Sequence, residues 1–327
     1  MIDFELFRPK GLREAVAALA EGDADRSVMV LAGGQDLLTE LKEHLVEPKR
    51  VVDLSALPEL AGLEVRADGS VRIGANTTLD QLVRHAELRT RLPGLVEAAE
   101  SVASPQIRSV ATVGGNLNQR PRCWYYRSED ALCLKKGGSV CFAANGMSKY
   151  NAILGGGPSY IVHPSDLAPM LVALEASVNL VGPNGSRSVP LSEYYLLPSE
   201  GDLLTETRRL PGEVMVDVVL PAARSGLKTH YLKFKERESY DWALAAVAVA
   251  AVVENGALRY GRMVLGGVAP KPWSVPIEKI LGSTKLDEES IARIADASVA
   301  DAKPLAHNGY KVPLVRGLVT RALRTLA

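Results

Sequence analysis

The sequence has no surplus of either charge and no long apolar run. Its 38 lysines and arginines are balanced by 38 aspartates and glutamates, so the formal net charge of the 327 residues is zero. Nucleic-acid binding normally needs a basic surplus that neutralises phosphates, and none is present. The longest apolar run extends from Trp242 to Val253, whereas a membrane helix needs about twenty residues. We therefore expect no nucleic-acid partner and no membrane span.

Cysteine is scarce, and the three that occur are close together in the chain. An odd number of local cysteines cannot form the disulfide framework of a small secreted protein. The N-terminus has Asp3 and Glu5 where a signal peptide has basic residues, and no long apolar stretch follows. These features predict a cytoplasmic chain. They favour a metal or cluster site at the cysteines, with three unrelated buried thiols as the alternative.

Several common motifs are also missing. The chain contains neither the six-residue glycine fingerprint of dinucleotide-binding folds nor a phosphate loop that ends in Lys-Ser or Lys-Thr. No Gly-x-Ser-x-Gly phrase marks a hydrolase nucleophile. The five histidines lack the spacing of a metal-binding pair. A standard Rossmann site and a hydrolase are therefore not indicated, and we assign no general base.

The hydrophobic pattern predicts a mixed helix and strand chain of about two compact units. Alternating alanine and valine in the run 242–253 favour a strand over a helix, and the run 110–116 is β-rich. We place a domain boundary near residue 177. The other predicted strands are 27–32, 51–54, 63–67, 70–73, 178–181, 214–220, 230–235 and 258–266, and the predicted helices are 11–20, 93–103, 166–176, 290–299, 314–326 and two that begin near 36 and 78.

Two glycine pairs follow predicted strands. Gly33-Gly34 lies between an apolar strand and a helix that would begin near Asp36, and Gly114-Gly115 ends the second β-rich run. Glycine permits a phosphate to approach the backbone closely, and helix N-termini favour anions. The two loops could hold the two ends of one extended diphosphate ligand. For each pair alone, an ordinary strand-to-helix turn is the alternative.

The cysteines lie in an irregular segment, residues 119–160. A stretch of this length without periodicity inside a compact domain usually has a function. Thiolates favour zinc or iron–sulfur clusters, but the spacing Cys123-x9-Cys133-x7-Cys141 fits neither the paired zinc arrangement nor the ferredoxin run. A fourth thiol is missing. The nearby candidates for a fourth ligand are Ser159 and His163.

Three phrases occur in order along the chain: Leu31-Ala-Gly-Gly-Gln-Asp-Leu-Leu38, Ala111-Thr-Val-Gly-Gly-Asn116 and His163-Pro-Ser-Asp166. Together they resemble the FAD-binding medium subunit of molybdenum hydroxylases, a family that includes the flavoprotein subunits of carbon monoxide dehydrogenase and bacterial xanthine dehydrogenases. The resemblance extends over almost the whole chain, with Tyr231-x-Lys233 and Asp241 at matching positions.

The resemblance implies an α+β fold in which FAD lies extended between two subdomains. A PCMH-type FAD-binding domain (1–177, with α/β subdomains at about 1–55 and 56–177) would precede a C-terminal domain like that of the carbon monoxide dehydrogenase flavoprotein (178–327), built on a three-stranded sheet. In the first phrase, Gln35 stands where the family usually has threonine. The implied FAD-binding residues are Leu31, Ala32, Gly33, Gly34, Gln35, Asp36 and Leu38 near the diphosphate, Thr112, Gly114, Gly115 and Asn116 near the diphosphate and isoalloxazine, Ser165 and Asp166 at the sugar or ribityl part, and Lys233 from the second domain.

The cysteine segment extends the resemblance to a subgroup. The phrases Gln119-Arg-Pro-Arg-Cys-Trp-Tyr-Tyr-Arg127 and Cys133-Leu-Lys-Lys-Gly-Gly138, followed by Cys141, are similar to the subunits that carry an extra [4Fe-4S] cluster, as in bacterial aldehyde oxidoreductases and 4-hydroxybenzoyl-CoA reductase. The subgroup has a fourth cysteine after a Gly-Pro pair, where this chain has Ser159. The implied ligands are Cys123, Cys133 and Cys141, with Ser159, His163 or water at the fourth iron.

The function implied by the resemblance is electron transfer from iron–sulfur centres through FAD to an external acceptor. The expected partners are a large molybdopterin-binding subunit and a small [2Fe-2S] subunit. Two other classes are alternatives: a free-standing flavin oxidase and a non-redox zinc-binding scaffold protein. A flavin spectrum without substrate turnover by the isolated chain separates the three, because zinc is colourless and an oxidase turns over.

Overall fold

A small parallel sheet begins the chain. The computed structural model describes residues 1–282 and 285–326. Strands β1 (Glu5–Phe7), β2 (Val28–Leu31) and β3 (Arg50–Asp53) pair in the order β1-β3-β2. Helix α1 (Leu12–Ala20) buries its apolar side against this sheet, and α2 (Leu37–Lys42) follows β2 after the first glycine pair. The predicted order of strand, glycine turn and helix is confirmed.

The second sheet has five antiparallel strands, and it corrects the predicted domain boundary. Its order is β4-β5-β8-β6-β7, formed by β4 (Leu63–Val65), β5 (Val71–Gly74), β6 (Ser177–Gly182), β7 (Gly185–Pro190) and β8 (Val214–Leu220). Val218 of β8 pairs with Ile73 on one side and with Val178 on the other. Residues 177–220 therefore complete a sheet that begins at residue 63, because β8 lies between β5 and β6. The break between the two units follows β8 and precedes β9, so it is not at residue 177.

A third sheet, again antiparallel, forms the second unit. Its order is β12-β11-β10-β9, with β9 (Lys228–Phe234), β10 (Ala245–Glu254), β11 (Ala257–Gly266) and β12 (Trp273–Val275). The expected sheet had three strands. The short β12 adds the fourth by pairing Val275 with Met263 at the free edge of β11.

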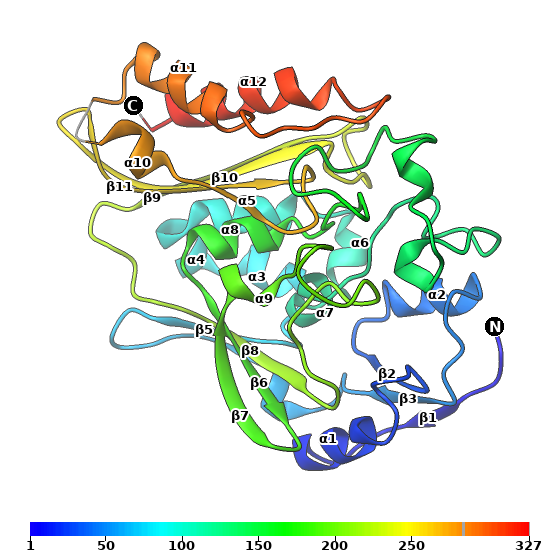
Figure 1. The fold of residues 1–327 in the computed structure, drawn as a ribbon. Helices are drawn as coiled ribbons and strands as arrows, with labels where there is room; N and C mark the ends of the chain where they lie inside the picture. The colour runs from blue at the N-terminus through cyan, green and yellow to red at the C-terminus, as the bar shows by residue number, and fades with distance from the viewer. Residues whose placement is uncertain (283–284, 327) are drawn as a thin grey trace.

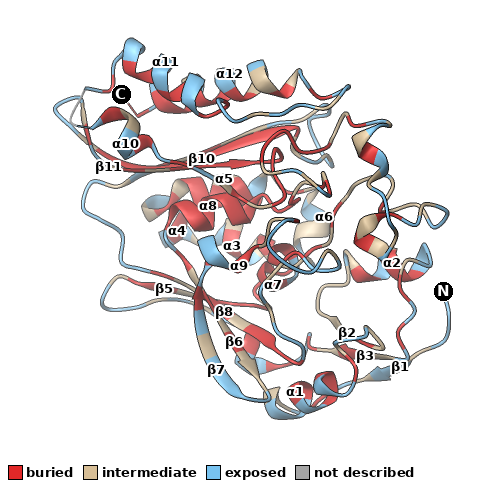
Figure 2. Cartoon of the chain, in the orientation of Figure 1, coloured by how far each residue is buried: buried red, intermediate tan, exposed pale blue. Residues whose placement is uncertain are grey.

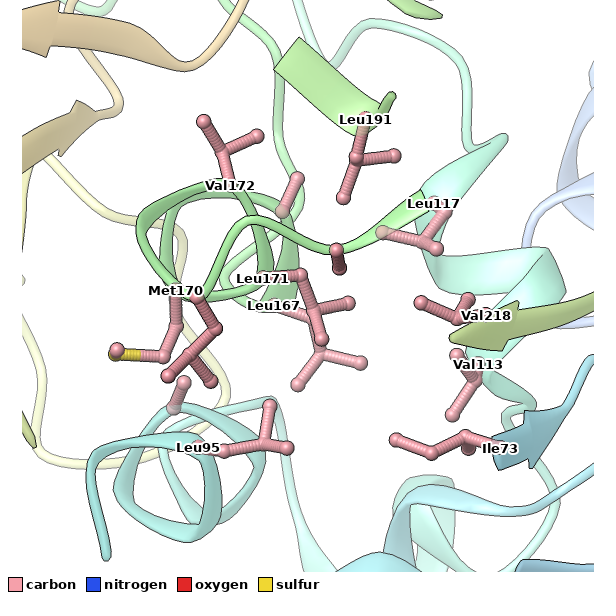
Figure 3. Packing of buried hydrophobic residues seen from close by; sticks show 14 of the residues in the cluster. Ile73, Leu95, Val113, Leu117, Leu167, Met170, Leu171, Val172, Leu191 and Val218 are labelled. Carbon is pink, nitrogen blue, oxygen red and sulfur yellow. The ribbon is translucent and has the colours of Figure 1, made fainter. Parts of the chain in front are cut away.

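Helices fill the space between the second and third sheets (Figure 1). These helices are α3 (Leu79–Arg84), α4 (Ala86–Arg91), α5 (Pro93–Glu100), α6 (Pro105–Arg108), α7 (Val113–Leu117), α8 (Leu167–Ala173) and α9 (Leu191–Tyr194), with a 3-10 turn at Pro58–Leu60. Figure 3 shows Leu95, Met170 and Val218 in one packed core, which joins α5 and α8 to the five-stranded sheet. No helix in the described part of the chain has the length and apolar character needed to cross a bilayer.

Strand β10 is buried on both faces, which settles the choice between strand and helix (Figure 2). Ala246 and Ala248 face the core that contains α8, whereas Val247 and Val249 face α10 (Ile277–Leu281), α11 (Glu288–Ala297) and α12 (Lys311–Arg324). Side chains alternate between the two faces of a strand. The small alanines therefore let α8 pack closely on one face, and the larger valines pack against the outer helices on the other. The predicted helices at 290–299 and 314–326 correspond to α11 and α12.

The prediction that the run 110–116 is β-rich is wrong: Thr112 makes an isolated bridge to Thr78, and the helix α7 occupies the second half. α7 begins there, because the Thr112 hydroxyl accepts a hydrogen bond from the Gly115 N–H at 3.1 Å and caps the helix. Such a cap satisfies an amide that a new helix leaves free, and it outweighs the β preference of valine and threonine. The segment 119–160 is irregular as expected, with only two 3-10 turns, Leu134–Lys136 and Phe142–Ala144.

Candidate functional site

The first glycine loop presents free backbone amides. The N–H groups of Gly33, Gly34 and Gln35 donate no hydrogen bond to any residue that the structure describes. Gly34 has a φ of 72°, in the left-handed region that glycine adopts without strain. Three successive free donors at the start of α2 form the kind of site that binds an anion.

The same loop packs tightly against the segment that leads into α7. A Cβ atom on Gly33 would lie 2.2 Å from the carbonyl oxygen of Val110. Only glycine permits this approach of two backbones. The two glycine loops are therefore neighbours, as the diphosphate hypothesis requires.

The second loop has its amides occupied, which differs from the expectation for it. The Gly114 N–H donates to the Ala75 carbonyl at 2.8 Å, and the Gly115 N–H donates to Thr112. The cap and the neighbouring chain use these donors, so the loop offers a phosphate no free amide at either glycine. Of the two loops, only the first therefore has the free amides that an anion cradle needs, whereas the second could contribute side chains.

Asn116 connects the second loop to the His-Pro-Ser-Asp phrase. The Ser165 hydroxyl donates to Asn116 Oδ1 at 2.6 Å and accepts from the Ala168 N–H at 3.0 Å. Asn116 and Ser165 are both buried. Residues predicted from two separate phrases thus form one hydrogen-bonded unit at the start of α8.

Asp166 links this unit to the third sheet. Tyr231 donates its hydroxyl proton to Asp166 Oδ1 at 2.8 Å, and Lys233 Nζ donates to Oδ2 at 2.7 Å and to the Ser101 carbonyl at 3.1 Å. The Lys233 and Asp166 side chains are only 3% and 4% exposed. Burial and the Asp166 charge raise the pKa of Tyr231 well above its ordinary value. The prediction that Lys233 reaches the site from the second unit is consistent with this placement.

A cavity of about 410 Å³ opens beside Ser165 and Asp166. Its wall includes the rings of Trp124, Tyr150 and Trp242, and the Arg122 guanidinium lies 4.5 Å from the Trp242 ring centre. Clefts that bind flat organic groups are typically lined by aromatic side chains with a few polar atoms. The cavity has that character.

His163 belongs to the same wall and has one buried polar atom without a hydrogen bond in the described part of the chain. Its ring meets Tyr195 edge-on with the centres 4.3 Å apart. Burial lowers the pKa of His163 to about 4, so the imidazole is neutral at pH 7. Among the described residues Nε2 has no hydrogen-bond partner, and a buried group in that condition usually meets a ligand or water.

Asp36 anchors the cysteine segment. Its carboxylate accepts from the Arg120 N–H at 2.6 Å and pairs with Arg122 and Arg127 at 2.9 Å and 2.7 Å. The carboxylate is thus held by three basic residues, although the resemblance places Asp36 near the diphosphate. Of the remaining predicted residues, Leu31 and Ala32 are half-buried at the end of β2, and Gln35 and Leu38 are exposed.

Glu206 joins the same segment to the loop after α9. It pairs with Arg120 at 3.1 Å and with Lys135 at 2.7 Å, and both the Glu206 and Lys135 side chains are almost fully buried. Sequence reasoning missed this network. Arg120, Arg122 and Arg127 lie close to Cys123 in the sequence of a chain that is neutral overall. This local excess of arginine could have indicated buried acidic partners. Nothing in the sequence connected Glu206 to them.

Removal of the Glu206 charge is expected to destabilise the chain. In Glu206→Gln two buried cations lose their counter-charge, and loss of one partner of a buried pair typically costs about 3–5 kcal/mol. Urea unfolding measures the change. Glu200→Gln is the control, because Glu200 pairs with Lys271 at 3.4 Å near the surface. Equal stability of the two variants would show that the Glu206 network does not hold the segment.

The three cysteines are close together in the sequence but do not form a ligand set. Burial raises the pKa of Cys133, and Asn151 Nδ2 lies 3.5 Å from the Cys123 sulfur. No group of three His, Cys, Asp or Glu residues in the described ranges is arranged to hold a metal ion. Ser159 is buried, and within those ranges its hydroxyl makes no hydrogen bond to a thiol. The cluster therefore stays a prediction.

The sequence matches two family models that divide the chain where the sheets divide it. Residues 2–223 match the FAD binding domain in molybdopterin dehydrogenase, and residues 230–326 match the CO dehydrogenase flavoprotein C-terminal domain. The chain belongs to the FAD-binding medium subunits of the molybdenum hydroxylase family. The break between the two matches lies between β8 and β9, as the strand pairing indicates.

Individual relatives support this membership. The chain is 36% identical to the aldehyde oxidoreductase FAD-binding subunit PaoB of Escherichia coli over 90% of this chain and 89% of that protein. It is 31% identical to the carbon monoxide dehydrogenase medium chain of Hydrogenophaga pseudoflava over 98% and 96%. A solved structure of carbon monoxide dehydrogenase from Hydrogenophaga pseudoflava matches with a TM-score of 0.77 at 29% identity and covers 99% of this chain and 98% of that one. Such homologues are oxidoreductase subunits, and the expected α+β fold is confirmed.

Proposed function

We propose that this FAD-binding subunit transfers electrons from the iron–sulfur centres of a molybdenum hydroxylase through FAD to an external acceptor. The observation that carries the proposal is the row of three free amides at Gly33, Gly34 and Gln35, which leads by way of Asn116 and Ser165 to an aromatic cavity. A dinucleotide has the same order of parts: an anionic diphosphate in the middle and a flat redox ring at one end.

The residues present fit FAD. The free amides of the first loop would hold the diphosphate, and Ser165 and Asp166 would hold the sugar or ribityl hydroxyls. The isoalloxazine ring would take the cavity, whose wall includes the neutral His163. FAD supplies the redox chemistry when bound, while these residues bind and orient it. The Arg122 guanidinium, which lies over the Trp242 ring, would place a positive charge beside the flavin ring.

The proposed partners are a large molybdopterin-binding subunit and a small [2Fe-2S] subunit, in a cytoplasmic complex. The names of the carbon monoxide dehydrogenase relatives describe a medium chain, which implies larger and smaller companions. Three cysteines cannot supply the four thiolates of even one all-cysteine [2Fe-2S] centre. Co-purification from the native source is the test, and recovery of a lone, fully active chain would contradict it.

We also propose that Cys123, Cys133 and Cys141 hold a [4Fe-4S] cluster, with Ser159 near the fourth iron. Two observations support it: the three cysteines occur within one irregular segment, and that segment is basic. Residues 119–160 contain six lysines and arginines but only Glu129 and Asp130 as acids, in a chain that is neutral overall. A thiolate-bound cluster is anionic, so a basic surrounding stabilises it.

The cluster and the flavin are tested on freshly purified protein. We expect a flavin spectrum with no substrate turnover by the isolated chain, since an oxidase would turn over and a zinc protein would be colourless. Anaerobic iron and sulfide analysis with electron paramagnetic resonance compares the native chain with Ser159→Cys, which restores a fourth thiol. Zinc, or no metal, in both proteins would exclude the cluster and leave the FAD proposal intact.

A further inference from the structure

Lys311 is a buried cation without a carboxylate partner. Its side chain is 0% exposed, and Nζ donates to the carbonyl oxygens of Gly267 at 2.7 Å and Tyr150 at 3.2 Å. Within the described part of the chain no acid lies within ion-pair distance of it. Lys311 also begins α12, where the positive end of the helix disfavours a cation. A buried ammonium in this position is costly. If residue 311 only held these carbonyls against α12, as a structural tether, a neutral donor would do so at a lower cost.

Neutral side chains already make that tether. Asn308 Nδ2 donates to the carbonyls of Asn151 and Ala152 at 3.1 Å and 3.3 Å, and the Tyr310 hydroxyl donates to the Lys149 carbonyl at 2.9 Å. Together with Lys311, these residues cap successive carbonyls along one stretch of the cysteine segment. The capping function therefore does not require a charge at residue 311.

The position of the charge indicates its use. Gly267 and Tyr150, whose carbonyls bind the ammonium, both line the cavity of about 410 Å³. The ammonium thus lies directly behind the cavity wall, in surroundings of low dielectric constant where a charge acts more strongly than in water. The acids at the cavity each pair with another basic residue: Asp166 with Lys233, Glu236 with Lys149, and Asp241 with Arg237.

We propose that the Lys311 ammonium sets the electrostatic potential of this cavity and stabilises the negative charge that a flavin ring gains on reduction. The inference rests on the proposed function, because it needs the ring of FAD in the cavity. Reduced flavin is anionic at neutral pH, whereas oxidised flavin is neutral. A fixed cation behind the wall therefore favours the reduced form and raises the midpoint potential, a role by which a protein tunes its cofactor.

The charge at residue 311 depends on pH. Burial lowers the pKa of Lys311 to about 7, so the ammonium is charged below pH 7 and neutral above it. The other titratable groups around it are His307 and Tyr310 on its own segment, and Lys149 and Tyr150 on the facing one. Glu236 binds both Lys149 and Tyr150. Burial raises the pKa of Tyr310 to about 12, so Tyr310 does not titrate near neutrality.

The test is the flavin midpoint potential of the FAD-loaded chain, measured by spectroelectrochemistry at two values of pH. The lower one is pH 7, where the reduced ring carries its negative charge and part of Lys311 is protonated, and the other is well above it. Lys311→Met keeps the length of the side chain and removes the charge, and Lys311→Gln keeps a donor and removes the charge. Asn308→Leu is the matched control, because it removes two carbonyl caps and leaves Lys311 in place. We expect both Lys311 variants to have a more negative potential than the native chain at the lower pH and the native potential at the higher one.

Three results would overturn the inference. Unchanged potentials in both Lys311 variants would show that the charge does not act on the ring. An equal shift in Asn308→Leu would show that loss of the tether alone explains the effect. A native chain that takes up no FAD would overturn the proposed function, and the role of Lys311 with it, whereas normal uptake with an unshifted potential would overturn only the role of Lys311.

Discussion

Gly33→Ala is expected to abolish stoichiometric FAD binding and to destabilise the chain. The new methyl group would lie 2.2 Å from the Val110 carbonyl oxygen and 3.0 Å from its carbon. Both are backbone atoms, so no side chain can rotate away and the two loops must separate. Overpacking of this kind costs about 1–3 kcal/mol, and the separation also moves the three free amides. Fluorescence titration with FAD and thermal unfolding measure the two effects.

Gly317→Ala is the matched control for this variant. A Cβ at Gly317 meets nothing within 4 Å, and the residue lies inside α12. Alanine favours a helix over glycine by about 1 kcal/mol, so this variant should bind FAD normally and unfold at the same or a higher temperature. If Gly33→Ala binds FAD as well as Gly317→Ala, the first loop is not the anion cradle.

Lys233→Met is expected to cause a large loss of stability. It leaves the Asp166 carboxylate buried with only the Tyr231 hydroxyl as partner, and removal of one member of a buried pair typically costs about 3–5 kcal/mol. The pair joins α8 to β9, so the loss also loosens the contact between the two units. Urea unfolding of the FAD-free chain separates this effect from any loss of cofactor.

A double variant distinguishes charge from packing at this pair. Asp166→Asn together with Lys233→Met removes both charges, so it should recover part of the stability that Lys233→Met loses. Arg324→Met breaks the exposed pair with Glu288, and such surface pairs contribute little. A loss of stability in Lys233→Met no greater than that in Arg324→Met would contradict a structural role for the buried pair.

The sequence predicted the first glycine turn and strand β10 correctly, because both depend on residues that are neighbours in the chain. Glycine is favoured where a strand turns sharply into a helix and another backbone approaches closely, as happens at Gly33 and Gly34. The Ala246 to Val249 alternation has the period of a strand, and burial on both faces accounts for its lack of polar residues. These features could be read from neighbours in sequence alone.

Long-range pairing could not be read in the same way. The boundary near residue 177 followed a change in local composition, whereas the insertion of β8 between β5 and β6 depends on strands far apart in the chain. The occupied amides of Gly114 and Gly115 depend on Ala75 and on a helix cap. Lys311 resembles any surface lysine in the sequence, and only its burial against Gly267 and Tyr150 gives it a role.

Bound flavin, measured directly, tests the central claim. The purified chain is incubated with FAD, freed of excess cofactor by gel filtration and then denatured, and the released flavin is measured by absorbance against protein concentration. We predict one FAD for each native chain and a large loss in Gly33→Ala but not in Gly317→Ala. No retained flavin in a folded native chain that is supplied with FAD would contradict the claim.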